Sequence, residues 1–359
     1  GKVDRFSGER SVAIGAKAEA LGTGGIAIGD NAATTDGHNS VAIGVYSKTQ
    51  NEKAISIGAF NKATGAQSIV IAGNYDTKNS DGVSTATAAR ATVIGAETNV
   101  SGEQSVAIGD KNTIASARTY AIGNNINLAA GTGDSLVFGT QAHTGASHAV
   151  AMGKNATVQA QSGVAIGDNA VTNGINQVSI GYKAGDVTET DNKKIPRTTD
   201  IGNFGVMIGN YAGAQYTADQ NTPVKHQHGT VAVGTQAGRA GKDSWSNIAV
   251  GNQAGRAVHG NDNIAIGVNS GSGKMTDKFD SDGKDVSTVV QHTLSMGTLS
   301  TVKNNFNIAI GTTANAGNGE KNPDGSTKNG YSVAIGTSAN ASALNSMALG
   351  AGASASHEY

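Results

Sequence analysis

The chain is dominated by a short repeat whose anchor is the pentapeptide Ser-Val-Ala-Ile-Gly. Close variants of this motif fill most of the 359 residues, and the intact motif occurs at 11–15, 40–44, 105–109 and 332–336. Anchor glycines follow one another every fourteen residues from Gly95 to Gly123 and from Gly139 to Gly181. A period this strict predicts one small structural unit stacked many times, and it favours an elongated scaffold over a catalytic globule.

The amino-acid composition narrows the possible classes of protein. The 51 glycines are accompanied by only 3 prolines, which excludes collagen and a proline-rich linker. Aromatic residues make up 4% of the chain, too few for a conventional large core, whereas small apolar residues suit thin, stacked layers. A net charge of −1 without a basic block argues against nucleic acid or an anionic membrane as the main partner. The absence of cysteine excludes a disulfide framework and a zinc–thiolate site.

Within one repeat, the sequence alternates in the manner of a β-strand. In the first motif, Val12 and Ile14 fall on one face and Ala13 on the other, and the alternation returns at 18–20 after a turn. Each repeat therefore predicts two short strands and two tight turns, which form a flattened two-sided coil. Strands of successive coils are expected to pair in parallel and in register, which predicts an all-β solenoid of about twenty coils.

A coil of this size buries few large side chains, so we expect a second buried surface. One Val and one Ile per coil offset only part of the conformational entropy lost when the repeat becomes ordered. The small face of the strand is suited to close approach of another sheet. This predicts a homo-oligomer with the small face at a shared axis, although the alternation is also compatible with the reverse facing. The candidate interface residues are the middle alanines of the motif: Ala13, Ala42, Ala107, Ala165, Ala265, Ala309 and Ala334.

The hexapeptide Asn-Ser-Val-Ala-Ile-Gly at 39–44 and its copies resemble the repeat of YadA-like head domains in trimeric autotransporter adhesins. The resemblance extends from Ser11 to Ser356. It implies a left-handed parallel β-roll, a homotrimer with its chains side by side, and display at the cell surface from the outer membrane of a Gram-negative bacterium. The left hand comes from the resemblance alone, since the general crossover rule favours right-handed connections. The family's stalk and membrane anchor are missing here, so we expect the head fragment of a longer protein.

Departures from the repeat mark the places where the roll carries additional chain. Long interruptions occur at 73–91, 182–204, 210–230, 270–293 and 312–330. In the middle of the chain an Ala-Gly pair follows the anchor, as in Tyr182-Lys183-Ala184-Gly185, and the second glycine is expected to open the turn. We interpret the chain as a single roll with inserted surface loops. Its zones are regular coils over 1–181, coils with long loop insertions over 182–335 and regular coils over 336–359.

The candidates for receptor binding lie in or beside these interruptions, because loops on rigid scaffolds commonly carry binding. Aromatic anchors are favoured at interfaces, and they are scarce in this chain. The alternatives are that each aromatic plugs the roll at an insertion, as we expect for Phe306, and that the basic residues are simply solvated. The receptor-binding candidates are Tyr211, Tyr216, Trp245, Phe279, Lys193 and Lys194.

One acidic turn has the spacing of a partial calcium loop. Asp280, Asp282 and Asp285 offer oxygen ligands around a glycine turn, but no Glu closes the loop, and a solvated turn is the simpler interpretation. No other cofactor is expected. The chain lacks a Gly-x-Ser-x-Gly elbow, a phosphate loop and a His-Glu-x-x-His motif, which argues against an enzyme.

Three hypotheses about function follow. The first, implied by the resemblance, is an adhesin head that binds an extracellular matrix protein (collagen, fibronectin or laminin) or an immunoglobulin-like host receptor of the CEACAM type. The second is a structural spacer or self-association module whose receptor site lies elsewhere in the parent protein. The third is an enzyme on a β-helical scaffold, such as a polysaccharide lyase or a hexapeptide acyltransferase, and the fourteen-residue period argues against it.

Overall fold

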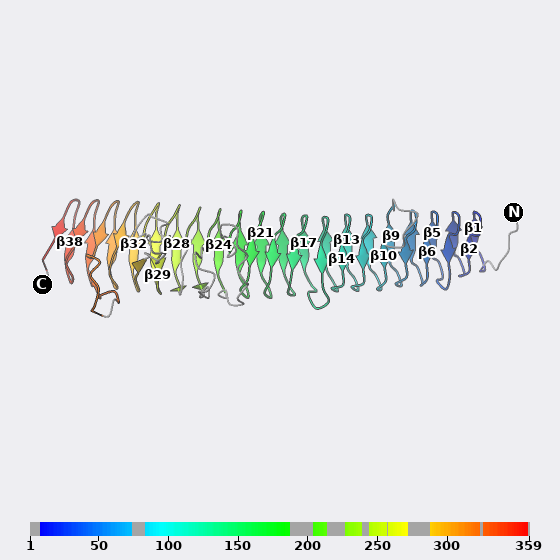
Figure 1. Cartoon of the computed structure of the whole chain (residues 1–359), viewed down its shortest axis with the longest axis horizontal. Helices are drawn as coiled ribbons and strands as arrows, with labels where there is room; N and C mark the ends of the chain where they lie inside the picture. The colour runs from blue at the N-terminus through cyan, green and yellow to red at the C-terminus, as the bar shows by residue number, and fades with distance from the viewer. Residues whose placement is uncertain are drawn as a thin grey trace. The chain divides into compact units, whose positions relative to one another are not determined.

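The computed structural model describes residues 8–73, 83–186, 204–213, 227–238, 244–256, 258–271, 288–323 and 326–357, and these residues are all-β. They fall into two compact units, Gly1–Ser162 and Gly163–Tyr359. In each unit, strands of three residues, called long strands below, lie side by side along the chain, and most alternate with short strands of two residues (Figure 1).

The first unit contains regular coils with one long and one short strand. Its long strands are β1 Val12–Ile14, β3 Ile26–Ile28, β5 Val41–Ile43, β7 Ile55–Ile57, β9 Ile69–Ile71, β11 Thr92–Ile94, β13 Val106–Ile108, β15 Tyr120–Ile122, β17 Leu136–Phe138 and β19 Val150–Met152. Its short strands are β2 Glu19–Ala20, β4 Ala33–Thr34, β6 Lys48–Thr49, β8 Lys62–Ala63, β10 Thr85–Ala86, β12 Asn99–Val100, β14 Thr113–Ile114, β16 Asn127–Leu128, β18 His143–Thr144 and β20 Thr157–Val158.

The second unit has the same kind of long strand but a less regular return path. Its long strands are β21 Val164–Ile166, β23 Val178–Ile180, β24 Val206–Ile208, β26 Val231–Val233, β28 Ile248–Val250, β30 Ile264–Ile266, β32 Leu294–Met296, β34 Ile308–Ile310, β36 Val333–Ile335 and β38 Met347–Leu349. Its short strands are β22 Val171–Thr172, β25 Gln227–His228, β27 Ser244–Trp245, β29 Val258–His259, β31 Thr288–Val289, β33 Thr301–Val302, β35 Asn315–Ala316, β37 Asn340–Ala341 and β39 Ser354–Ala355.

Neighbouring strands pair in parallel, with equivalent residues of successive coils opposite one another. Val106 lies opposite Tyr120 in the long strands, and Thr113 lies opposite Asn127 in the short strands. Both pairs are separated by one repeat, which confirms the predicted stack of two-strand coils. The handedness of the roll and its continuity as a single domain stay predictions.

The interruptions of the repeat leave the register of the long strands intact. Ile71 lies opposite Ile94 across the first interruption, Ile266 opposite Met296 across the fourth, and Ile310 opposite Ile335 across the last. The additional chain is therefore accommodated on the return path between long strands.

The anchor glycine is required by both its backbone conformation and the coil above it. Gly95 has a φ of +136°, and a Cβ there would lie 2.2 Å from the carbonyl oxygen of Gly109 in the next coil. The same carbonyl accepts a hydrogen bond of 2.7 Å from Thr98 Oγ1 inside the coil. Stacking therefore tolerates no side chain at Gly95.

The middle residue of every long strand after β1 faces the interior of its own coil, so the facing and interface role expected for the alanines are wrong for six of the seven. The first and third residues of the strand point outward instead. Two sheets packed back to back in a short coil leave little depth, and a small residue such as the fully buried Ala107 fits this space. Ala13 in β1 is exposed, and the other six alanines are buried within one chain: Ala42, Ala107, Ala165, Ala265, Ala309 and Ala334.

The Ala-Gly coils of the second unit have a left-handed glycine where regular coils begin their short strand. At one such position, Gly213, φ is +61° and a Cβ would lie 2.3 Å from Met207 Sδ in the interior. This conformation agrees with the expected opening of the turn. The glycines of the four Ala-Gly pairs and of the equivalent Ser270-Gly271 pair have φ between +58° and +69°: Gly185, Gly213, Gly238, Gly255 and Gly271.

Candidate interaction surfaces

The outward residues of the long strands form two apolar rows in each unit. We call the first residues of these strands the first row, the third residues the third row, and both together the outer rows. Every residue in the outer rows is aliphatic, Met, Phe or Tyr except Thr92. They are half-buried or exposed, as Ile57, Ile94 and Ile208 illustrate. An apolar surface repeated over ten coils in each unit is larger than soluble monomers commonly leave uncovered.

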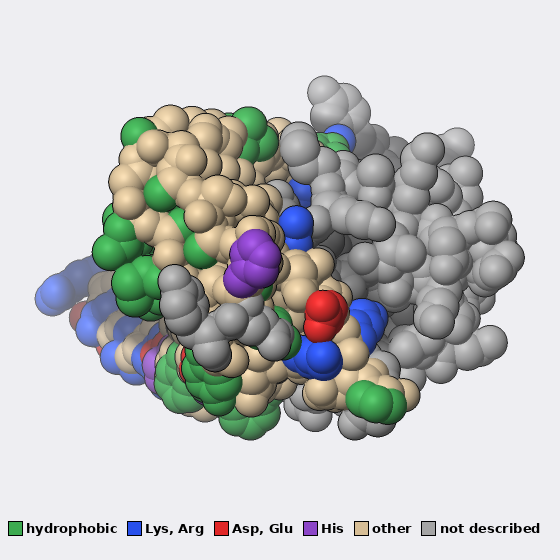
Figure 2. All heavy atoms as spheres, turned by 90° about the vertical axis from the view of Figure 1, so that its left-hand side faces the viewer, with side chains coloured by type: hydrophobic (Ala, Val, Ile, Leu, Met, Phe, Trp, Pro, Cys, Tyr) green, Lys and Arg blue, Asp and Glu red, His purple; other side chains and the backbone are tan. Residues whose placement is uncertain are grey.

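Hydrophobic side chains also reach the surface at the C-terminal end of the chain (Figure 2). Ile335, Met347 and Leu349 belong to the outer rows of β36 and β38 there, and all three are exposed. The outer rows therefore continue to the last long strand of the second unit.

A second surface consists of the turn that leads into each long strand. The residue two positions before the strand has positive φ, as at Asn39 (+57°) and Asn345 (+54°). We call this position the entry turn. Because equivalent residues stack coil on coil, side chains at the entry turn form a column along each unit.

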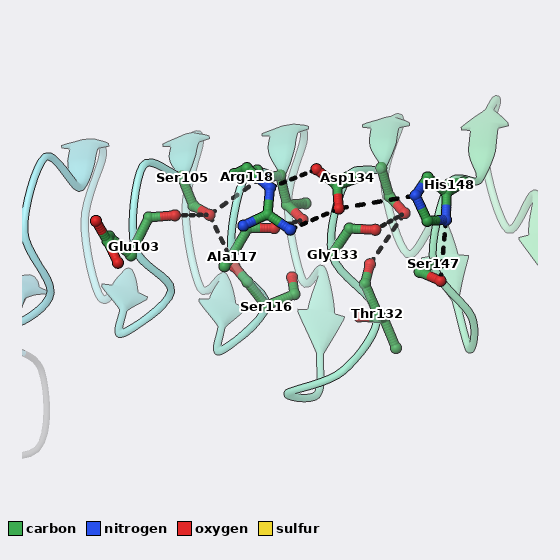
Figure 3. Close-up of polar contacts among 12 residues, drawn as sticks. Glu103, Ser105, Ser116, Ala117, Arg118, Thr132, Gly133, Asp134, Ser147 and His148 are labelled. Atoms are coloured by element: carbon green, nitrogen blue, oxygen red, sulfur yellow. Dashed lines mark hydrogen bonds and ion pairs between the residues drawn. The ribbon is translucent and has the colours of Figure 1, made fainter.

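In the first unit the entry-turn column carries an ion-pair ladder (Figure 3). Arg118 donates from Nη2 to Asp134 Oδ2 at 2.7 Å, and His148 Nε2 lies 3.9 Å from the same oxygen. The hydrogen bond from Arg118 holds the pKa of the Asp134 carboxyl below its ordinary value, and it raises the pKa of Arg118. These groups are open to solvent, where such pairs stabilise little. We interpret the ladder as a surface feature of the scaffold.

In the second unit the entry-turn column carries three stacked aromatic rings. The ring centroids of His292 and Phe306 lie 4.9 Å apart at an interplanar angle of 19°, and those of Phe306 and Tyr331 lie 5.1 Å apart at 11°. His292 Nδ1 lies 3.3 Å from Asp262 Oδ2 in the preceding coil. We call His292, Phe306 and Tyr331 the aromatic ladder. Phe306 is 39% exposed, so the expectation that it plugs the interior is wrong.

Buried asparagines hold the last interruption beside this ladder. Asn304 Nδ2 donates to the carbonyl of Glu320 at 3.1 Å, and Asn307 Nδ2 donates to that of Ala316 at 3.0 Å. Asn307 Oδ1 accepts from the backbone N–H of Ser332 at 2.9 Å, next to Tyr331. The third ring is thus positioned by a satisfied internal network.

Sequence reasoning did not single out His292 or Tyr331. Their separations from Phe306 differ because an interruption lies between Phe306 and Tyr331. The signal that could have found them is their shared offset, two residues before a strand motif, counted from each anchor separately.

Two of the receptor-binding candidates, Tyr211 and Trp245, lie within the described residues, and their surroundings differ. Trp245 is 56% exposed, and its backbone N–H donates to Asn261 Oδ1 at 3.0 Å. Tyr211 is half-buried and packs edge-on against Tyr182, with ring centroids 5.5 Å apart and Lys183 Nζ 5.4 Å from the Tyr211 ring. The remaining candidates lie outside the described residues: Tyr216, Phe279, Lys193, Lys194 and the proposed calcium ligands Asp280, Asp282 and Asp285.

No cluster of three or more His, Cys, Asp or Glu side chains among the described residues is arranged to hold a metal ion. Within the same ranges, no helix has the length and apolar character needed to traverse a bilayer.

Comparison with known families agrees with this architecture. Seven stretches match the family model described as YadA head domain repeat (2 copies): 7–32, 31–47, 36–61, 86–112, 133–156, 159–184 and 329–353. The chain carries YadA-type head repeats in these stretches. The resemblance expected from the motif is thereby confirmed, and the YadA-type repeats together with the solenoid point to a non-enzymatic structural protein. The matched stretches leave out 185–328, where the Ala-Gly coils occur. No curated protein matches the chain.

Proposed function

We propose that this YadA-like head is an adhesin displayed on a bacterial surface, associated as a homotrimer and bound non-covalently to a host protein. The observation that carries the proposal is the series of YadA head repeats on coils whose outer rows are apolar. The repeats support surface display and adhesion, and the outer rows support association of several copies.

The outer rows replace the buried alanines as the proposed trimer interface. They run along the stacking direction, so copies that cover them must lie side by side. Their aliphatic side chains are half-buried within one chain and would lose their remaining water contact on assembly, which is favourable in proportion to the area covered. Most of the first residues of the short strands, such as Lys48, Thr113 and Asn127, are polar and suit solvent.

Exposed aromatic side chains are the proposed contacts for the host protein. Trp245 and the aromatic ladder present large, rigid surfaces outside the outer rows, and aromatic anchors dominate many protein interfaces. Tyr211, Tyr216, Phe279, Lys193 and Lys194 remain candidates beside them. A trimer offers each contact three times, and many trimers on one cell turn weak binding into firm attachment.

The partner class is an extracellular matrix protein or an immunoglobulin-like receptor, and a binding array tests it. The purified head is applied to matrix proteins and receptor ectodomains beside a variant carrying Phe306→Asn and Tyr331→Asn. Asn fits this turn, because Asn39 and Asn345 occupy it with the same sign of φ. We expect binding by the parent head and at least a tenfold loss in the variant, the effect of removing about 1.4 kcal/mol of contact energy.

A matched control carries Gln67→Asn and Gln104→Asn at the same turn position in regular coils. It should bind as the parent does. Binding that survives in both variants would move recognition away from the ladder, and no binding to any protein on the array would favour the spacer or self-association alternative.

A further inference from the structure

The outer rows pose a problem of register for the trimer proposed above. In the first unit, six of the ten long strands present Val or Ile in the first row and Ile in the third, and most other positions in the two rows are also aliphatic or Met. Two copies that slip past each other by one coil would exchange an aliphatic contact for an equivalent one almost everywhere. Such a face associates readily but does not by itself define a unique alignment.

Two bulky side chains interrupt the uniform rows in adjacent coils. Tyr120, 55% exposed, stands in the first row of β15, and Phe138, 38% exposed, stands in the third row of β17. Their neighbours across the strand pair are Leu136 opposite Tyr120 and Ile122 opposite Phe138. The two aromatics therefore lie on different rows and are offset by one coil.

In a closed ring around an axis parallel to the stacking direction, the first row of each copy faces the third row of the next. In register, Tyr120 meets Ile122 of the next copy, and Phe138 meets Leu136, so each aromatic has an aliphatic partner. A slip by one coil in one direction sets Tyr120 against Phe138. Two aromatic side chains then compete for space that elsewhere holds two aliphatic ones, and overpacking of this kind is unfavourable.

Because the ring is closed, an unfavourable contact in one direction of slip is enough to disfavour every ring in which copies slip by one coil. The displacements around a closed ring of three copies sum to zero. A ring whose interfaces slip by no more than one coil therefore contains one slip in each direction whenever it is out of register. Every such ring includes the interface in which Tyr120 meets Phe138.

We propose that Tyr120 and Phe138 fix the axial register in which three copies of this chain associate. The inference rests on the proposed trimer, and it assigns these side chains a role in specificity that the other residues of the outer rows do not share.

Cysteine cross-linking tests the proposal cleanly, because the chain has no cysteine of its own. Val41→Cys with Ile43→Cys places thiols on the two rows of one coil and reports the aligned trimer. Val41→Cys with Ile57→Cys reports a slip in the unfavourable direction, and Ile55→Cys with Ile43→Cys reports the opposite slip. Disulfides form only between thiols brought close together, so each pair reports its own register.

In the otherwise unchanged chain, we expect covalently linked chains from the aligned pair alone. In a background of Tyr120→Val and Phe138→Ile, linked chains should also appear from both slipped pairs. Val and Ile occupy the same rows in neighbouring coils, so the circular dichroism spectrum should not change. A background of Val106→Ile and Ile108→Val is the matched control and should link from the aligned pair alone.

Linkage that stays confined to the aligned pair in the Tyr120→Val and Phe138→Ile background would overturn the proposal, as would slipped linkage in the unchanged chain. A chain that sediments as a monomer and links from no pair would overturn the trimer itself, which is a distinguishable failure.

Discussion

The regular coils of the first unit and the Ala-Gly coils of the second have the same kind of long strand, but the chain follows a different path back to the next long strand. A regular coil continues into a short strand whose second residue fills the interior, as the buried Ile114 and Leu128 do. An Ala-Gly coil has a left-handed glycine at the start of that strand instead. At Gly238, a Cβ would lie 3.2 Å from Ala232 Cβ, so the backbone itself packs against the long strand.

The outer rows do not follow this difference. Val106 and Ile108 in a regular coil have the same character as Val206 and Ile208 in an Ala-Gly coil, although the interiors behind them differ. The apolar character of the rows is therefore not a requirement of one kind of interior. The trimer that we propose would cover the rows in both regions and would account for their common apolar character.

The largest effect is expected from a charge placed in either interior. Ala107→Asp and Ala249→Asp each bury an unpaired carboxylate within a coil, and each should lower the free energy of unfolding by about 4 kcal/mol or more. Chemical denaturation of both variants measures the loss. An unchanged midpoint for either variant would contradict the inward facing of these alanines.

A charge in the outer rows should leave the coil folded and separate the copies. For Ile108→Asp and Ile266→Asp, we expect the sedimenting mass to fall from three chains to one, because a carboxylate at an apolar interface must be desolvated. The circular dichroism spectrum should remain that of the parent. Val100→Asp is the contrasting control, since its buried position predicts loss of structure as well.

Substitutions at the first position after the turn should have different effects on stability in the two regions. Gly213→Val forces a β-branched residue into a left-handed conformation against Met207, and we expect a loss of about 1–3 kcal/mol. Thr113→Gly, the converse change in a regular coil, should cost about 1 kcal/mol or less. Thermal unfolding of the pair compares them, and an equal or reversed order would mean that the two turns do not differ as described.

The smallest expected effect concerns pH in the first unit. The lowered pKa of Asp134 means that its pairing stabilises the fold fully above the ordinary carboxyl pKa of about 3.9, and that this contribution is lost as the pH falls through the lowered pKa of the folded chain. Asp134→Asn should therefore lower the melting temperature slightly near neutral pH, and the difference from the parent should shrink as acid protonates Asp134 in the folded parent. Asp36→Asn, an exposed change elsewhere, serves as the control. A constant difference between parent and Asp134→Asn at every pH would contradict the assignment.

The coil could be predicted well from the sequence, because the length of the repeat limits the shapes that a coil can take. Fourteen residues with two alternating stretches leave few alternatives to a two-strand coil, and the observed pairs, such as Val106 with Tyr120, follow that spacing. The anchor glycine and the Ala-Gly turns were also readable, because left-handed backbone has a distinct residue preference.

The facing of the strand was not predictable from the alternation alone. Ser-Val-Ala-Ile-Gly has a large and a small face, and the usual preference for large residues inside pointed the wrong way. The interior of so thin a coil accepts Ala42 and Ala107, and the large residues lie on the outer face. The aromatic ladder was missed because an interruption separates Phe306 from Tyr331 in the sequence. Their shared position appears only when each residue is counted from its own strand motif, and the pairing of the strands bears this out.

The most direct test of the central claim is the mass of the unmodified chain in solution, measured by sedimentation equilibrium over a range of concentrations. If the outer rows are covered by other copies, the chain should sediment with three times its own mass and remain so on dilution into the micromolar range. A folded, monodisperse monomer whose apolar rows stay in water would contradict the claim.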